Sequence, residues 1–291
     1  MNGLPICGIV GPGRLGTTLA IALHRLGCLQ WLKGCSPQHA ERAQAYGLPY
    51  GESWDDLPPV DLLWYAVPDR AIATVVEESV QALGTHRLRQ TALIHTAGSL
   101  GGEVFQGLPS DVEWGCAHPF QAFPWPPQPH LLRCIGWLVE SPHPRVHQRL
   151  TLLIRALGGI PVAVAHFPAE YRTRYHIAAV TASNALTALL RFALDIASSA
   201  GIPAPLFLHP IVEASVQNTF SAIGSLPLTG PITRADWPTL QHHIECLQDG
   251  ERAVYRSLLL ATASVARSHG LLSEEGWHQL QRLLPPELNK Q

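Results

Sequence analysis

The first half of the chain alternates short apolar runs with longer stretches whose apolar residues recur at helical spacing. Near-continuous apolar runs are typical of strands that are buried on both faces of a parallel sheet. The sequence predicts such strands at 5–10, 29–34, 60–67, 91–95, 114–117, 135–140 and 160–165. Because helical stretches separate most of these runs, the pattern favours an α/β domain with a mainly parallel sheet.

The pattern changes near residue 166, after which it is helical to the end, with interruptions at 201–203 and 224–231. We therefore expect an α/β domain at 1–166 and an all-α domain at 167–291. The longest apolar helix, 176–197, is interrupted by Thr, Ser, Asn and Arg, which favours a buried core helix over a membrane span.

A glycine-rich turn joins the first predicted strand to the first predicted helix. Gly11 allows a tight turn, Gly13 lets a pyrophosphate approach the backbone, and Gly16 lets the helix lie against the strand. A turn of this kind directs the positive end of the helix towards phosphate groups. The sequence thus predicts a Rossmann-type dinucleotide site, and a tight turn without a ligand is the alternative. The predicted contact residues of the turn are Gly11, Pro12, Gly13, Arg14, Leu15 and Gly16.

The tips of the following strands are expected to line the nucleotide. An acid at the tip of the second strand would select NAD, but Cys35 and Ser36 occupy that tip. The absence of the acid favours NADP, with Ser36 and Arg42 near the adenosine ribose and NAD as the alternative. Ligands bind at the carboxyl ends of strands in open parallel sheets. The further residues predicted there are Ala66, Val67, Pro68 and Thr96.

Two polar residues are candidates for catalysis. His118 closes a strand and could act as a general acid near neutral pH, or it could only hold the turn that follows it. His95 is a weaker candidate of the same kind. Asn184 lies in an apolar helix, so its amide either satisfies internal backbone groups or faces a ligand.

A compact loop at 228–236 offers groups that could bind a substrate. Thr229 and Gly230 carry a hydroxyl and an N–H, and Arg234 could hold a substrate carboxylate through two parallel hydrogen bonds. The alternative is an ion pair between Arg234 and Asp236 that shapes the loop and caps the next helix.

Composition narrows the possible partners. Of the 291 residues 46% are hydrophobic and 14% are charged, and the net charge of −2 gives no reason to expect binding to nucleic acid or a membrane. Six cysteines without a C-x-x-C pair indicate a reducing cytoplasm, and the histidines show no metal-ligand spacing. We therefore expect a cytoplasmic protein that binds a small-molecule substrate and no metal.

Together these motifs resemble one family, the Rossmann-like proteins with a helical C-terminal domain of unknown function. The matching segments are 11–16, 66–69, 95–98, 118–123, 182–184 and 228–232, with Arg234 and Asp236. The layout is similar to that of ketopantoate reductase, pyrroline-5-carboxylate reductase and the 6-phosphogluconate dehydrogenase group. The resemblance implies NAD(P) binding, a homodimer formed through the C-terminal helices and a site in the cleft between the domains. The chain departs from the family at two positions: it has Ala97 where serine is usual and Ala235 where glycine is usual.

Many proteins in the broader group use a lysine four residues before the asparagine of the long helix, and this chain has Val180 there. We therefore expect His118 to supply the proton, unless an imine substrate arrives already protonated. The expected function is hydride transfer between NADP(H) and a small carbonyl or imine compound. The alternative is a non-catalytic dinucleotide-binding or regulatory module that has lost the lysine.

Overall fold

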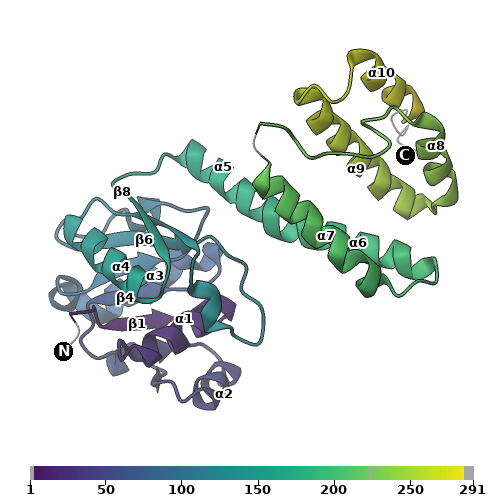
Figure 1. The fold of residues 1–291 in the computed structure, drawn as a ribbon. Coiled ribbons are helices and arrows are strands. Elements are labelled where there is room, and N and C mark those ends of the chain that lie inside the picture. Colours follow the sequence, from purple (N-terminus) through teal and green to yellow (C-terminus); the bar gives the residue numbers. More distant parts are fainter. Residues whose placement is uncertain (1–2, 223, 285–291) are drawn as a thin grey trace, which may run out of the picture. The chain divides into compact units, whose positions relative to one another are not determined.

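The computed structural model describes residues 3–222 and 224–284 (Figure 1). These residues form two compact units, one up to Leu190 and the other from Arg191 onward. The first unit contains a sheet of eight strands in the order β3-β2-β1-β4-β5-β6-β7-β8. The strands are β1 Cys7–Val10, β2 Leu29–Lys33, β3 Tyr50–Gly51, β4 Leu62–Tyr65, β5 Ala92–His95, β6 Trp114–Pro119, β7 Gly136–Glu140 and β8 Ile160–Val164.

The sheet is mainly parallel, which confirms the predicted α/β fold class. Within the described part of the chain, β6 and β7 form the one antiparallel pair, and β8 again runs parallel to β7. Seven of these strands overlap the seven predicted ones. The two-residue strand β3 was not predicted, because it is too short to produce an alternating pattern.

Four long helices cover the sheet (Figure 1). They are α1 Arg14–Arg25, α2 Pro37–Ala45, α3 Asp69–Leu88 and α4 Pro144–Ala156. Short 3-10 helices lie at Trp54–Asp56, Gly102–Phe105 and Pro129–Leu132.

Successive strand residues point to opposite faces of the sheet, which gives two cores. One core joins Trp64 to leucines of α1 and α4, and the other joins Leu63 and Tyr65 to α3.

The chain beyond β8 is helical, as predicted. Its elements are α5 Ala169–Val180, the π-helical turn η4 Thr181–Ala185, α6 Leu186–Ser199, α7 Ala204–Ser221, α8 Trp237–Cys246, α9 Asp249–Ser268 and α10 Glu274–Leu283. Helices α8, α9 and α10 share a third core. The first compact unit extends beyond β8, and within it two side chains of α5, Arg172 and Tyr175, bond to the sheet domain. The domain limits 1–166 and 167–291 remain a prediction.

The prediction of a buried core helix at 176–197 is wrong for the single chain. Arg172 and Ala197 are the buried residues of α5, η4 and α6 in the structure as described. The continuous stretch Ala169–Ser199 is long and apolar enough to cross a membrane by length and composition. Most of its apolar residues are exposed in the structure as described.

Candidate functional site

The glycine-rich turn lies between β1 and α1, and its glycines have different steric roles. Gly11 has a φ of +99°, and a Cβ there would lie 2.6 Å from the Ala66 carbonyl oxygen. A Cβ at Gly16 would overlap the Gly11 carbonyl. At Gly13, by contrast, no described atom lies within 4 Å of the position that a Cβ would take. The chain itself requires Gly11 and Gly16, whereas Gly13 leaves open space of the kind that a phosphate would need.

The first turn of α1 can bind an anion at this open space. Its first intrahelical bond runs from the Thr17 N–H to the Gly13 carbonyl, so the N–H groups before Thr17 lack helical acceptors. Among the described residues no side chain caps this end, and its first turn contains no acid. The turn therefore fits the phosphates of a dinucleotide.

The tip of β2 brings two predicted nucleotide contacts near the same turn. The Ser36 hydroxyl is buried and has no described hydrogen-bond partner. Arg42 donates to the Pro12 carbonyl at 3.4 Å, and its guanidinium lies 4.6 Å from the centre of the Trp125 ring. A guanidinium is thus held at the glycine-rich turn, where an additional phosphate could reach it.

The other predicted nucleotide contacts have more local roles. Cys35 is exposed, and its N–H donates to His39 Nδ1. The Thr96 hydroxyl donates to the Tyr65 carbonyl at 3.3 Å and so joins the tips of β5 and β4. Ala66, Val67 and Pro68 form the tip of β4, beside Gly11.

His118 lies near the end of β6 and contacts a residue that the sequence analysis did not single out. Its Nδ1 is 2.6 Å from the hydroxyl of Tyr175, which lies on α5. Burial, together with the nearby His176, lowers the pKa of His118 to about 4, and burial raises the pKa of Tyr175 to about 12. At neutral pH the imidazole is therefore uncharged and the phenol keeps its proton. Proton donation in this pair must come from neutral N–H or O–H groups.

A cavity of about 300 Å³ brings His118 and Asn184 together, although they are distant in the sequence. The Asn184 side-chain oxygen accepts a hydrogen bond from the Ser183 hydroxyl at 2.8 Å. Its amide nitrogen has no partner among the residues described, so it can donate to a ligand. Asn184 lies on the π-helical turn η4, and such turns often occur at functional sites.

Two further residues of this cavity affect what chemistry it can support, His176 and Val180. His176 lines it, and the buried Nδ1 of His176 has no described partner. Val180, at the position where many relatives of the broader group have a lysine, also lines it. The wall thus offers imidazole and amide groups but no amine.

His95 has a structural role. Its Nδ1 accepts the Ala97 N–H at 3.2 Å, and its Nε2 lies 3.0 Å from the Gly101 carbonyl and 2.8 Å from Cys116 Sγ. Burial lowers its pKa to about 4. The neutral ring therefore fixes the turn after β5.

Thr229, Gly230 and Arg234 lie in the second compact unit. Asp236 caps α8 by accepting hydrogen bonds from the N–H and hydroxyl of Thr239. The alternative Arg234–Asp236 ion pair is absent from the described interactions. The loop is closed by its own backbone, since the Arg234 N–H donates to the Gly230 carbonyl.

The described residues contain no group of three or more His, Cys, Asp or Glu that could hold a metal. All six cysteines are free thiols.

Comparison with known proteins agrees with this architecture. The family model described as a Rossmann-like domain matches residues 4–119, and Domain of unknown function (DUF2520) matches residues 135–262. No curated protein was found to match the chain.

Several solved structures have a similar fold. A proposed NADP oxidoreductase from Bacteroides fragilis is 21% identical with a TM-score of 0.76, over 90% of this chain and 98% of that one. Pyrroline carboxylate reductase from Plasmodium falciparum, with NADP bound, is 14% identical with a TM-score of 0.58, over 93% and 100%. An imine reductase variant from Myxococcus stipitatus, in complex with NAD+, is 17% identical with a TM-score of 0.57, over 97% and 99%. The chain thus combines a Rossmann-like domain with a DUF2520 domain, the arrangement that its sequence resemblance implies.

Proposed function

We propose that the protein is an NAD(P)-dependent oxidoreductase that transfers a hydride between NADP(H) and a small carbonyl or imine compound. The observation that carries this proposal is the open space at Gly13, beside an uncapped helix end and between two glycines that the chain requires. The similar folds of reductases solved with NADP or NAD+ bound support it.

The nucleotide would lie along the tips of the parallel strands. The N–H groups of Arg14, Leu15 and Gly16 would bind its pyrophosphate. The partnerless Ser36 hydroxyl and the Arg42 guanidinium would receive a 2′-phosphate, which is why we favour NADP over NAD. Bound there, the dinucleotide supplies or accepts the hydride.

The pair formed by His118 and Tyr175 would handle the proton. When the tyrosine hydroxyl donates to His118 Nδ1, the neutral imidazole carries its proton on Nε2. That proton would pass to the substrate oxygen or nitrogen while the Tyr175 hydroxyl passes its own proton to Nδ1, so that the imidazole stays neutral and water reprotonates the phenolate afterwards. The free amide N–H groups of Asn184 would orient the substrate. In the second compact unit, Arg234, with Thr229 and Gly230, offers groups that could bind a carboxylate.

Kinetics would test the catalytic assignment. His118→Ala should lower kcat by about a hundredfold or more, because a general acid contributes about that much. Tyr175→Phe should lower kcat less and leave KM for NADPH unchanged, since it acts through His118. Unchanged turnover in His118→Ala would show that this histidine is structural.

A non-catalytic dinucleotide-binding module is the second candidate, favoured by Val180 at the lysine position in the cavity wall. The two are separated by titrating the protein with NADPH and NADH and then screening carbonyl and imine substrates. Tight NADPH binding without turnover of any substrate would support the module. If neither dinucleotide raises the melting temperature, both proposals fail, because a ligand specific for the folded state must stabilise it.

We also propose that the C-terminal helices form a homodimer in the cytoplasm. The exposed apolar side chains on α5, α6 and α7 support this, and they include Ile177, Leu189, Phe207, Ile211 and Phe220. A second copy suits this surface better than lipid, because Thr181, Ser183 and Asn184 interrupt it with polar groups.

A further inference from the structure

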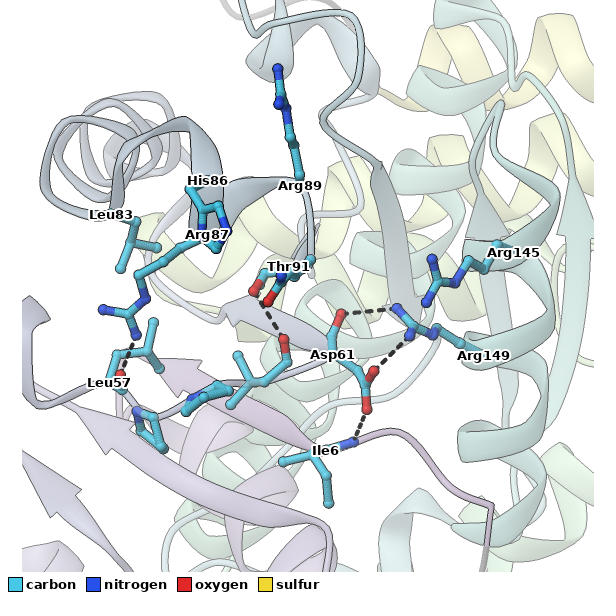
Figure 2. Close-up of a pocket in the computed structure, with 14 residues that line it drawn as sticks. Ile6, Leu57, Asp61, Leu83, His86, Arg87, Arg89, Thr91, Arg145 and Arg149 are labelled. Atoms are coloured by element: carbon cyan, nitrogen blue, oxygen red, sulfur yellow. Dashed lines mark hydrogen bonds and ion pairs between the residues drawn. The ribbon is translucent and has the colours of Figure 1, made fainter.

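A second, larger cavity lies at the amino ends of the strands (Figure 2). Its volume is about 730 Å³, within the range that accommodates a small organic ligand. Ile6, Asp61 and Thr91 line it, and each directly precedes a strand: β1, β4 and β5. The glycine-rich turn follows β1 at the opposite edge of the sheet, so the two sites are distinct.

The lining of this cavity is strongly basic. It contains four arginines, Arg87, Arg89, Arg145 and Arg149, and one acid, Asp61. The chain as a whole carries a net charge of −2, so this concentration of arginine is local. Such a lining attracts anions.

Three of the arginines have partners within the protein. Arg149 pairs with Asp61 at 2.6 Å, and the other Asp61 oxygen accepts the Ile6 N–H at 2.9 Å. Arg87 donates to the Leu57 carbonyl, and Arg89 pairs with Asp111. Asp61, the one acid of the lining, therefore already has partners and does not neutralise the other arginines.

Arg145 differs from the other three. It lies in the first turn of α4, which contains no acid, and it has no hydrogen-bond or ion-pair partner among the described residues. A cation is unfavourable at the positive end of a helix, and Arg149 adds a like charge one turn further on. Figure 2 shows the two side chains next to each other on α4. An anion bound here would relieve both repulsions.

The geometry points to a binding site for a small organic phosphate with an apolar group. The phosphate would lie between Arg145, whose unpaired guanidinium can donate paired hydrogen bonds, and Arg149, which bonds to Asp61 and can donate through its remaining N–H groups. The apolar group would contact the uncharged wall formed by Leu57, Pro58 and Leu83. A phosphate suits the site better than a carboxylate because its charge, about −1.5 to −2, better matches the excess of arginine.

Calorimetry on the full chain with 1-naphthyl phosphate would test this site. We expect 1-naphthyl phosphate to bind, 1-naphthoate to bind more weakly and 1-naphthol not to bind. Arg145→Gln should weaken naphthyl phosphate binding by about tenfold or more, the loss expected for a charge-assisted hydrogen bond.

Two variants serve as controls for charge and location. Arg155→Gln removes the same charge from an exposed position of α4 outside the cavity lining, and Arg42→Gln removes it beside the glycine-rich turn. Both should leave the affinity for naphthyl phosphate unchanged. Absence of binding, equal binding of naphthoate, or equal losses in Arg145→Gln and Arg155→Gln would overturn the proposal. Loss in Arg42→Gln but not in Arg145→Gln would overturn it too, because the probe would then occupy the dinucleotide site.

Discussion

The sheet domain and the helical segment α5–α7 use similarly apolar sequences in opposite ways. In the sheet domain large side chains such as Trp64, Trp137 and Tyr65 are fully buried. In the helical segment the exposed fraction is 58% for Phe207, 62% for Ile211 and 88% for Phe220. Hydrophobic patterning alone therefore predicts the elements but not which of them are covered by the same chain.

The junction between the two regions combines hydrogen bonds with aromatic contacts of Tyr175. Glu140 at the end of β7 is buried, and it accepts hydrogen bonds from Arg172 of α5 and from the Phe167 N–H. A second side chain of α5, Tyr175, forms the hydrogen bond with His118 of β6. The start of α5 is thus fixed to the sheet by hydrogen bonds, whereas apolar side chains further along it, such as Ile177 and Val180, are exposed.

The largest expected effect comes from breaking this junction. Arg172→Ala should destabilise the sheet domain by about 3–5 kcal/mol, because Glu140 would become a buried charge without its partner. Urea denaturation followed by the fluorescence of the buried tryptophans would measure the loss. Arg174→Ala is the matched control, since its ion pair with Glu170 is exposed and contributes little. Equal losses in the two variants would mean that α5 is not fixed by Arg172.

Acid should destabilise the sheet domain before the helical segment. The folded-state pKa of His95 is about 4, below its ordinary value of 6.5, so protonation favours the unfolded chain. The stability that the neutral His95 imidazole contributes to the folded state is fully present above pH 6.5. About 3 kcal/mol of it is lost as the pH falls towards 4. Denaturation at pH 7 and pH 4 should show a smaller difference for His95→Gln than for the unmodified protein.

Exposed His24 provides the control for that experiment. His24→Gln makes the same substitution at an exposed position of α1, and a reduction equal to that in His95→Gln would contradict the assignment to His95. Hydrogen exchange would locate the acid-sensitive amides, which we expect around β5 and β6. Amides that open first in α7 would contradict the assignment to His95.

A smaller effect is expected from a charge on the exposed helical surface. Ile211→Asp should weaken the proposed homodimer by about 2 kcal/mol, or about thirtyfold, because a charge would be buried in the interface. Sedimentation over a range of concentrations would measure this change. Leu152→Asp is the matched control, since Leu152 is exposed on α4 in the sheet domain. A protein that is monomeric at every concentration would refute the homodimer.

The difference between the two regions also explains what could be predicted from the sequence. The strands and the glycine-rich turn were predictable because they depend on local pattern. His118 and Asn184 were each identifiable, but their common cavity depends on how α5 packs, which local pattern does not determine. Tyr175 and Arg172 were missed because polar residues on a helix usually face solvent. The signal available was their spacing of three, which puts them on one helix face.

The smallest expected effect concerns backbone strain, which occurs in the sheet domain and in the loop before α8 of the second compact unit. Cys134 and Ala235 have positive φ values of 57° and 53°, in the left-handed region that costs a residue with a Cβ about 1–2 kcal/mol. Ala235 also stands where the resembling family usually has glycine. Ala235→Gly should therefore stabilise the second unit by about 0.5–1 kcal/mol, after the greater entropy of unfolded glycine is subtracted. Thermal denaturation would measure it, and Ala253→Gly in helix α9 should have the opposite sign. If Ala235→Gly and Ala253→Gly destabilise the protein equally, the backbone at Ala235 is not strained.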